Sequence, residues 1–143
     1  MNLLEKIKYN FDKVGYIIKL IDEWHPKKCN SEKDFEKSLY NFLHNKLTNI
    51  QITKQYALGR IKADIVVDNN IIIEIKFNLN SRNNYQRLIG QLIEYKQWEG
   101  TVIVLLIGKT DQNFIKDLKI FIQREGNTTS LEPEKFVLYE KDL

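Results

Sequence analysis

The sequence predicts a three-layer α/β domain with a mixed sheet that is flanked by helices. Two adjacent β-branched runs, separated by a short polar turn, predict a hairpin, and a later continuous apolar run is typical of a strand buried on both faces. Amphipathic helical segments precede and follow these runs. The length of 143 residues and the hydrophobic content of 43% favour one globular domain over 1–143.

The N-terminal part of the chain predicts two helices. Hydrophobic residues recur at spacings of three and four up to Ile21, so a first helix is expected to end near Trp24, where Pro26 follows. Its apolar stripe comprises Leu3, Leu4, Ile7, Phe11, Val14, Ile18 and Ile21. We expect the stripe to pack in the core, and the alternative is a dimer interface. A second helix is predicted over 31–46, with Ser31 as its N-cap. Its buried stripe would be Phe35, Leu39, Phe42 and Leu43.

Strands and helices then alternate along the chain. Strands are predicted over 50–53, 61–67, 71–77, 101–107 and 135–139, and helices over 81–98 and 111–124. After the N-terminal helix, the order is therefore α-β-β-β-α-β-α-β.

Composition narrows the chemistry that the chain can support. A single cysteine, Cys29, excludes an intramolecular disulfide, and with only His25 and His44 beside it an all-protein zinc site is not expected. The net charge of +3 is compatible with nucleic-acid binding if the basic groups cluster. The sequence shows no apolar run of transmembrane length and no signal-peptide pattern, so we expect a soluble, cytoplasmic protein that does not bind membranes.

The hydrophobic pattern of the hairpin selects its register. A three-residue loop at 68–70 sets Asp64 opposite Glu74, whereas a two-residue loop would pair Asp64 with Ile75. With the longer loop, one face is wholly apolar: Ile61, Ala63, Ile65, Val67, Ile71, Ile73, Ile75 and Phe77. The other face then brings Asp64, Glu74 and Lys76 together.

Two carboxylates and an ammonium in central strands point to phosphodiester hydrolysis. Neighbouring carboxylates repel each other unless a cation lies between them, and Mg²⁺ takes one or two carboxylates together with water and phosphate oxygens. A lysine beside them can orient the attacking water and offset developing charge.

These residues resemble the motif of the PD-(D/E)XK nuclease superfamily, which has the restriction-endonuclease-like fold. The matching pattern is Asp64 … Glu74-Ile-Lys, preceded by a helix that contains Glu36. The resemblance covers roughly 31–107 and implies a catalytic core of αβββαβ order there. It leaves 1–25 as an N-terminal helical addition and 108–143 as a C-terminal helix and strand.

The resemblance also implies the roles of individual residues. Mg²⁺, with Mn²⁺ as a substitute, would be held by Asp64, Glu74 and Ile75, and Lys76 would act on the nucleophile. Glu36 would be the supporting helix acid, with Glu32 as the alternative. The sequence departs from the motif at Ala63, where the motif has proline.

A second match follows on the helix predicted over 81–98. Gln91-Leu-Ile-Glu-Tyr95 resembles the Gln-x-x-x-Tyr motif of RecB-like nucleases, which implies that Gln91 supports catalysis together with Glu36. The i, i+4 spacing puts Gln91 and Tyr95 on one helical face. The iron–sulfur cluster found in part of that branch is excluded by the single cysteine. The predicted substrate contacts are Arg60, Lys62, Arg82, Arg87 and Tyr95.

We therefore expect a Mg²⁺-dependent DNA nuclease that uses metal-activated water. It would be an endonuclease that acts on branched DNA or in restriction or repair. RNA is an alternative substrate, and the protein could act as a homodimer. The alternative is a catalytically inactive nuclease-fold module that binds nucleic acid or a protein partner.

Overall fold

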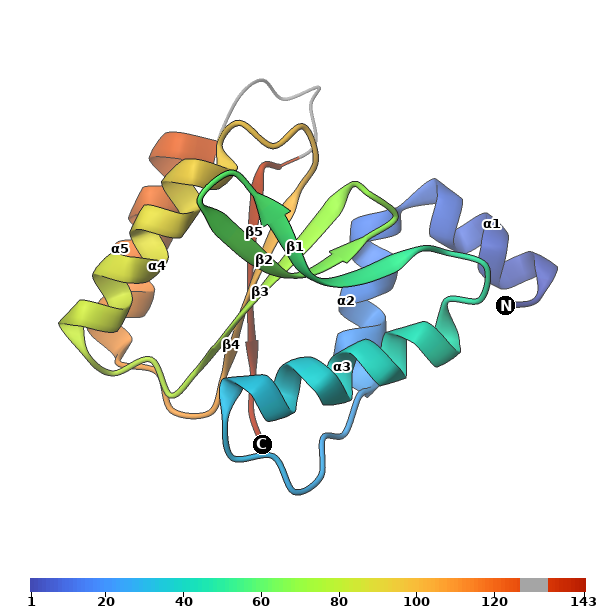
Figure 1. The fold of residues 1–143 in the computed structure, drawn as a ribbon, viewed down its shortest axis with the longest axis horizontal. Helices are drawn as coiled ribbons and strands as arrows, with labels where there is room; N and C mark the ends of the chain where they lie inside the picture. Colours follow the sequence, from blue (N-terminus) through green and yellow to red (C-terminus); the bar gives the residue numbers. More distant parts are fainter. Residues whose placement is uncertain (127–133) are drawn as a thin grey trace.

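A five-stranded mixed sheet lies at the centre of this computed structural model, which describes residues 1–126 and 134–143 (Figure 1). The strands, in their order across the sheet, are β1 (Ile52–Leu58), β2 (Ile61–Val67), β3 (Ile71–Phe77), β4 (Val102–Ile107) and β5 (Phe136–Lys141). The first three strands pair antiparallel, and β3, β4 and β5 pair parallel. The predicted strands are confirmed, although β1 starts after position 50 and continues beyond position 53, where it was expected to end.

Helices cover both faces of this sheet, as Figure 1 shows. One face carries α1 (Leu3–Phe11), α2 (Lys13–Glu23) and α3 (Glu32–Lys46), and the other carries α4 (Arg82–Tyr95) and α5 (Gln112–Gly126). Each face has its own apolar core, with Ile73 on the side of α3 and Ile72 on the side of α4. Every residue of β4 is buried, as expected for a strand covered on both faces. The predicted α/β class is confirmed.

Helix caps fix where α3 and α4 begin. The Ser31 hydroxyl accepts a hydrogen bond from the Asp34 amide at 3.2 Å, and the Ser81 hydroxyl accepts one from the Asn84 amide at 3.3 Å. In α3, the residues at three- and four-residue spacing that face the sheet are buried: Phe35, Leu39 and Leu43, with Phe42 partly buried. The prediction for this helix is confirmed.

The expectation of one continuous N-terminal helix is wrong. Asp12 interrupts it with a non-helical backbone (φ −148°, ψ 87°) and caps α2, because its carboxylate accepts a hydrogen bond from the Gly15 amide at 2.9 Å. The interruption turns α1 so that its apolar side chains are exposed: Leu3 at 74%, Leu4 at 59%, Ile7 at 57% and Phe11 at 91%. Tyr9 is buried instead.

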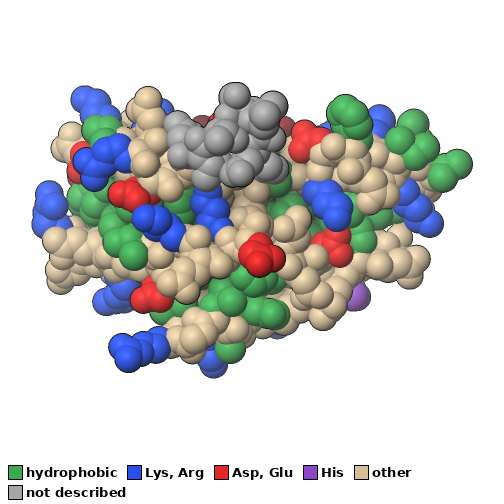
Figure 2. Space-filling model, turned by 90° about the horizontal axis from the view of Figure 1, so that it is seen from above, with side chains coloured by type: hydrophobic (Ala, Val, Ile, Leu, Met, Phe, Trp, Pro, Cys, Tyr) green, Lys and Arg blue, Asp and Glu red, His purple; other side chains and the backbone are tan. Residues whose placement is uncertain are grey.

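The space-filling view shows hydrophobic side chains projecting at the end of the molecule where α1 lies (Figure 2). Within 1–126 and 134–143, no helix is long and apolar enough to cross a membrane.

The register of the β2–β3 hairpin is the predicted one. Ile65 pairs with Ile73 and Val67 pairs with Ile71, so the connection is the three-residue loop at 68–70. Continuing this register by one residue sets Asp64 across from Glu74. The predicted apolar face is wrong at its far end, because Ile61 and Ala63 pack in the core beneath α4 and α5.

Candidate functional site

The carboxylates of Asp64, which is partly buried, and of Glu74, which is buried, form the centre of the candidate site. Asp64 is partly buried on β2, and Glu74, on β3, is 1% exposed. The pairing of β2 with β3 ends at Ile65 and Ile73. Beyond it, the Ile75 amide donates a hydrogen bond to the side chain of Asp64, at Oδ2, over 2.8 Å. Glu74 Oε2 accepts a hydrogen bond from the Tyr95 hydroxyl at 2.8 Å. The other carboxylate oxygen, Glu74 Oε1, is buried and accepts no hydrogen bond from any described residue.

Lys76 supplies positive charge next to this pair. Its side chain is 12% exposed, and its Nζ lies 3.5 Å from Glu74 Oε1, which is ion-pair distance but longer than a good hydrogen bond. One ammonium faces two carboxylates, so the site retains negative charge when both acids are ionised.

Burial sets the ionisation of the pair. Burial raises the pKa of Glu74, the charge of Asp64 raises it further, and Lys76 and Tyr95 oppose these effects. Burial also raises the pKa of Asp64 against the lowering effects of the Ile75 amide and Lys76, and Glu36 and Glu32 contribute smaller increases. Burial raises the pKa of Tyr95, so its phenol stays protonated and remains a donor to Glu74.

Two acids of α3, Glu36 and Glu32, lie close enough to Asp64 for their charges to act on it. Glu36 is 9% exposed, and its Oε1 accepts a hydrogen bond from Gln55 Nε2 on β1 at 2.6 Å. Glu32 is exposed, and its Oε2 accepts a hydrogen bond from the Phe77 amide at 3.1 Å. Of the two candidate helix acids, Glu36 is the buried one. Gln55 was absent from the predicted site, and no sequence pattern distinguishes it from other polar residues of a strand.

The Gln-x-x-x-Tyr match has a structural counterpart on α4. Gln91 and Tyr95 lie one turn apart on that helix, and Gln91 Oε1 is buried without a hydrogen-bond partner among the described residues. Tyr95 is 1% exposed, and its hydroxyl is bound to Glu74, so in this structure it supports the acid pair rather than meeting substrate. Arg87 is exposed one turn before Gln91.

The other predicted substrate contacts are less well placed. Arg60 and Lys62 are exposed around the β1–β2 turn. Arg82 lines a groove between α4 and α5 together with Asp117 and Arg124, and none of the acids described above lines that groove. The structure therefore does not bring Arg82 together with the acid pair.

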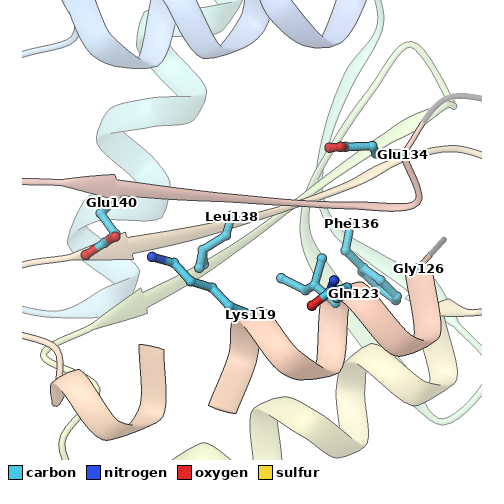
Figure 3. Close-up of a pocket in the computed structure, with 8 residues that line it drawn as sticks. Lys119, Gln123, Gly126, Glu134, Phe136, Leu138 and Glu140 are labelled. Atoms are coloured by element: carbon cyan, nitrogen blue, oxygen red, sulfur yellow. The ribbon is translucent and has the colours of Figure 1, made fainter. Parts of the chain in front are cut away.

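A second hollow, between α5 and β5, is also separate from the acids (Figure 3). Lys119 and Gln123 line it from α5, and Phe136 and Leu138 line it from β5. It contributes no residue to the candidate site.

The donor set fits a hard divalent cation. Within the described residues, no three His, Cys, Asp or Glu side chains lie close enough to form a metal cage. Ile75 can contribute only its main-chain carbonyl, and because its amide points toward β2, its carbonyl points to the same side. Two carboxylates, one of them with an unpartnered buried oxygen, and a main-chain carbonyl suit Mg²⁺ or Mn²⁺, which complete their coordination with water.

Glu74→Gln is expected to stabilise the metal-free protein, and to do so more at pH 8 than at pH 5. Because the pKa of Glu74 is raised in the folded protein, Glu74 keeps a proton there that the unfolded chain releases. The free energy of unfolding therefore falls as pH rises from 5 to 8. Glutamine removes this loss, which amounts to about 1.4 kcal/mol per unit of pKa shift. Urea unfolding in EDTA at both pH values measures the effect, with exposed Glu99→Gln as the control. A gain that is equal at both pH values would contradict the assignment.

Comparison with known proteins does not add to this geometry. No protein-family model, curated protein or solved structure matches the chain.

Proposed function

We propose that this protein is a divalent-metal-dependent nuclease that hydrolyses DNA phosphodiester bonds with water as the nucleophile. The observation that carries the proposal is the carboxylate pair of partly buried Asp64 and fully buried Glu74 with Lys76 beside it, on adjacent strands at the centre of the sheet. Withdrawing like charges from water costs free energy, so a carboxylate pair with one member fully buried favours the binding of a cation.

Each residue has a definite task in this proposal. Asp64, Glu74 and the Ile75 carbonyl would hold the cation, which supplies Lewis-acid activation of a bound water and neutralises phosphate charge. Lys76 would orient the attacking water and stabilise charge on the scissile phosphate. Tyr95 fixes the rotamer of Glu74 by its hydrogen bond, and Gln91 presents an unpartnered amide oxygen on the same helix.

The order of elements supports a restriction-endonuclease-like core. From α3 to β4, the chain reads αβββαβ, with the acids on β2 and β3 and a supporting acid on the preceding helix. This is the arrangement that the PD-(D/E)XK resemblance implies. We therefore assign the chain to that superfamily as part of the proposal.

The alternative is a module of the same fold that binds nucleic acid or protein without cutting. Such a module gains nothing from a buried carboxylate pair with an unpartnered oxygen, and the intact set of Asp64, Glu74 and Lys76 therefore favours catalysis.

A panel of substrates tests the proposal. Purified protein is incubated with linear duplex DNA, single-stranded DNA, a four-way DNA junction and RNA, each with Mg²⁺, Mn²⁺ or EDTA. We expect metal-dependent cleavage of DNA, and preference for the junction would point to a resolvase acting as a homodimer. Binding without cleavage under every condition would favour the binding module.

Arg87→Ala is expected to weaken DNA binding by up to about tenfold and to reduce its salt dependence by about one charge. The reason is that Arg87 is exposed one turn before Gln91 on α4, so it shares a helical face with Gln91 and is free to contact phosphate. The single-turnover rate at saturation should stay near that of the wild type. Arg82→Ala is the matched control on the same helix, because Arg82 lines the groove facing α5. Equal effects of both variants would show that Arg87 has no special position.

A further inference from the structure

β1 is distorted at Gln55. Its φ is +51°, in the left-handed region that a non-glycine residue rarely adopts, and least of all in the middle of a strand. Lys54 pairs with Ile65 and Tyr56 pairs with Ala63, but between them Gln55 and Asp64 form no pair. Strained backbone of this kind persists where the surrounding structure compensates for it, and it is concentrated at functional sites.

The distortion turns the strand over. Side chains two residues apart on a regular strand share a face, but Lys54 lies over the Tyr40 ring of α3 whereas Tyr56 packs on Trp98 in the other core. The residues of β2 that pair with Lys54 and Tyr56 show the same reversal. Ile65 lies in the core beneath α3, and Ala63 lies in the core beneath α4. Gln55 is therefore directed toward α3, as Lys54 is.

The direction of Gln55 brings its amide to Glu36. The distance of 2.6 Å from Nε2 to Oε1 indicates a short, charge-assisted hydrogen bond to a carboxylate that is 9% exposed. A neutral amide fixes the position of the Glu36 carboxylate and leaves its negative charge in place. A lysine or arginine at position 55 would neutralise that charge. Glu36 is near enough to Asp64 that its charge raises the pKa of Asp64.

We propose that Gln55 is a positioning residue whose left-handed backbone and amide hold Glu36 within electrostatic reach of Asp64, so that Glu36 adds negative charge to the surroundings of the cation site. This inference rests on the proposed function, because it assigns Glu36 a task in holding the cation and its water. The strain at Gln55 is then the cost of aiming a strand side chain at the helix acid.

Two substitutions separate the backbone from the amide. Gln55→Met keeps the length of the side chain but removes the donor, and Gln55→Gly removes both the donor and the strain. We expect both variants to bind Mn²⁺ about tenfold more weakly by isothermal titration and to cleave DNA about tenfold more slowly in single turnover, as the loss of a residue that positions a metal site typically does. Gln55→Gly should nevertheless unfold at equal or higher urea concentration than the wild type. Lys28→Gly, at an exposed residue with φ of +56°, is the control for relief of strain and should leave Mn²⁺ binding unchanged.

A double-mutant cycle shows whether Gln55 acts through Glu36. Glu36→Gln should weaken Mn²⁺ binding by a similar factor, and adding Gln55→Met to it should cause little further loss. Wild-type Mn²⁺ affinity and cleavage in Gln55→Met, or fully additive losses in the double variant, would overturn the inference and leave the nuclease proposal standing. A wild-type protein that neither binds Mn²⁺ nor cuts DNA would overturn both.

Discussion

Lys76→Ala is expected to lower the single-turnover rate of DNA cleavage by about 10²-fold or more, as the loss of a preorganised electrostatic contact usually does. Lys76 Nζ lies 3.5 Å from Glu74 Oε1 in a side chain that is 12% exposed, so its charge acts at the acid pair rather than along a DNA backbone. DNA affinity should therefore change far less, by at most about the tenfold expected for one phosphate contact. Cleavage is measured at saturating protein, and binding is measured with Ca²⁺ in place of Mg²⁺.

Lys62→Ala is the matched control for this variant. Lys62 is an exposed lysine on the neighbouring strand, two residues from Asp64, and its removal should affect DNA affinity more than the rate. Cleavage by Lys76→Ala at the wild-type rate would refute the role of Lys76 and would favour the binding module.

The hairpin that carries the acids could be predicted from sequence because its pattern has one solution. Alternating apolar residues in two β-branched runs fit a buried face only with the loop at 68–70, and the observed pairing of Ile65 with Ile73 follows. Glu74 and Lys76 then share a face by simple alternation. Local periodicity thus determined the central part of the candidate site.

The sequence could not show where that alternation fails. The predicted apolar face assumes regular strands, but Ala63 packs in the opposite core, as does Tyr56, its partner on β1 beyond the distortion at Gln55. A glutamine with positive φ has no sequence signature, since glycine or asparagine is the usual residue there. The contact from Gln55 to Glu36 joins two elements and depends on this distortion, so it is visible only in three dimensions.

The N-terminal stripe shows a similar limit. Spacings of three and four from Leu3 to Ile21 are unbroken, yet Asp12 ends α1 and caps α2. A capping aspartate within a helical pattern competes locally with the helix, and periodicity does not register it. In the second half of the stripe, Ile21 is buried and Val14 and Ile18 are partly buried against the same core, whereas the residues of the first half are exposed.

Asp64→Asn is expected to weaken Mn²⁺ binding by at least about 10²-fold, the upper end of the effect seen when only an outer partner of a metal ligand is lost. Asparagine keeps an oxygen that can accept the 2.8 Å hydrogen bond from the Ile75 amide, so the strand geometry should survive while the charge is removed. Isothermal titration measures the affinity, and the single-turnover rate should fall in parallel because the same carboxylate serves both.

The pH dependence of this binding gives a second readout. Burial raises the pKa of Asp64 to about 6 and that of Glu74 to about 8, so a cation must displace more protons from the pair at pH 6 than at pH 8. Wild-type Mn²⁺ affinity should accordingly rise from pH 6 to pH 8, and the rise should be smaller in Asp64→Asn, which has one titrating carboxyl fewer. Asp117→Asn, an exposed aspartate on α5, is the control for a general loss of negative charge and should behave as the wild type does. If Asp64→Asn binds Mn²⁺ as tightly as Asp117→Asn, the cation does not lie between Asp64 and Glu74, and the site must be placed elsewhere.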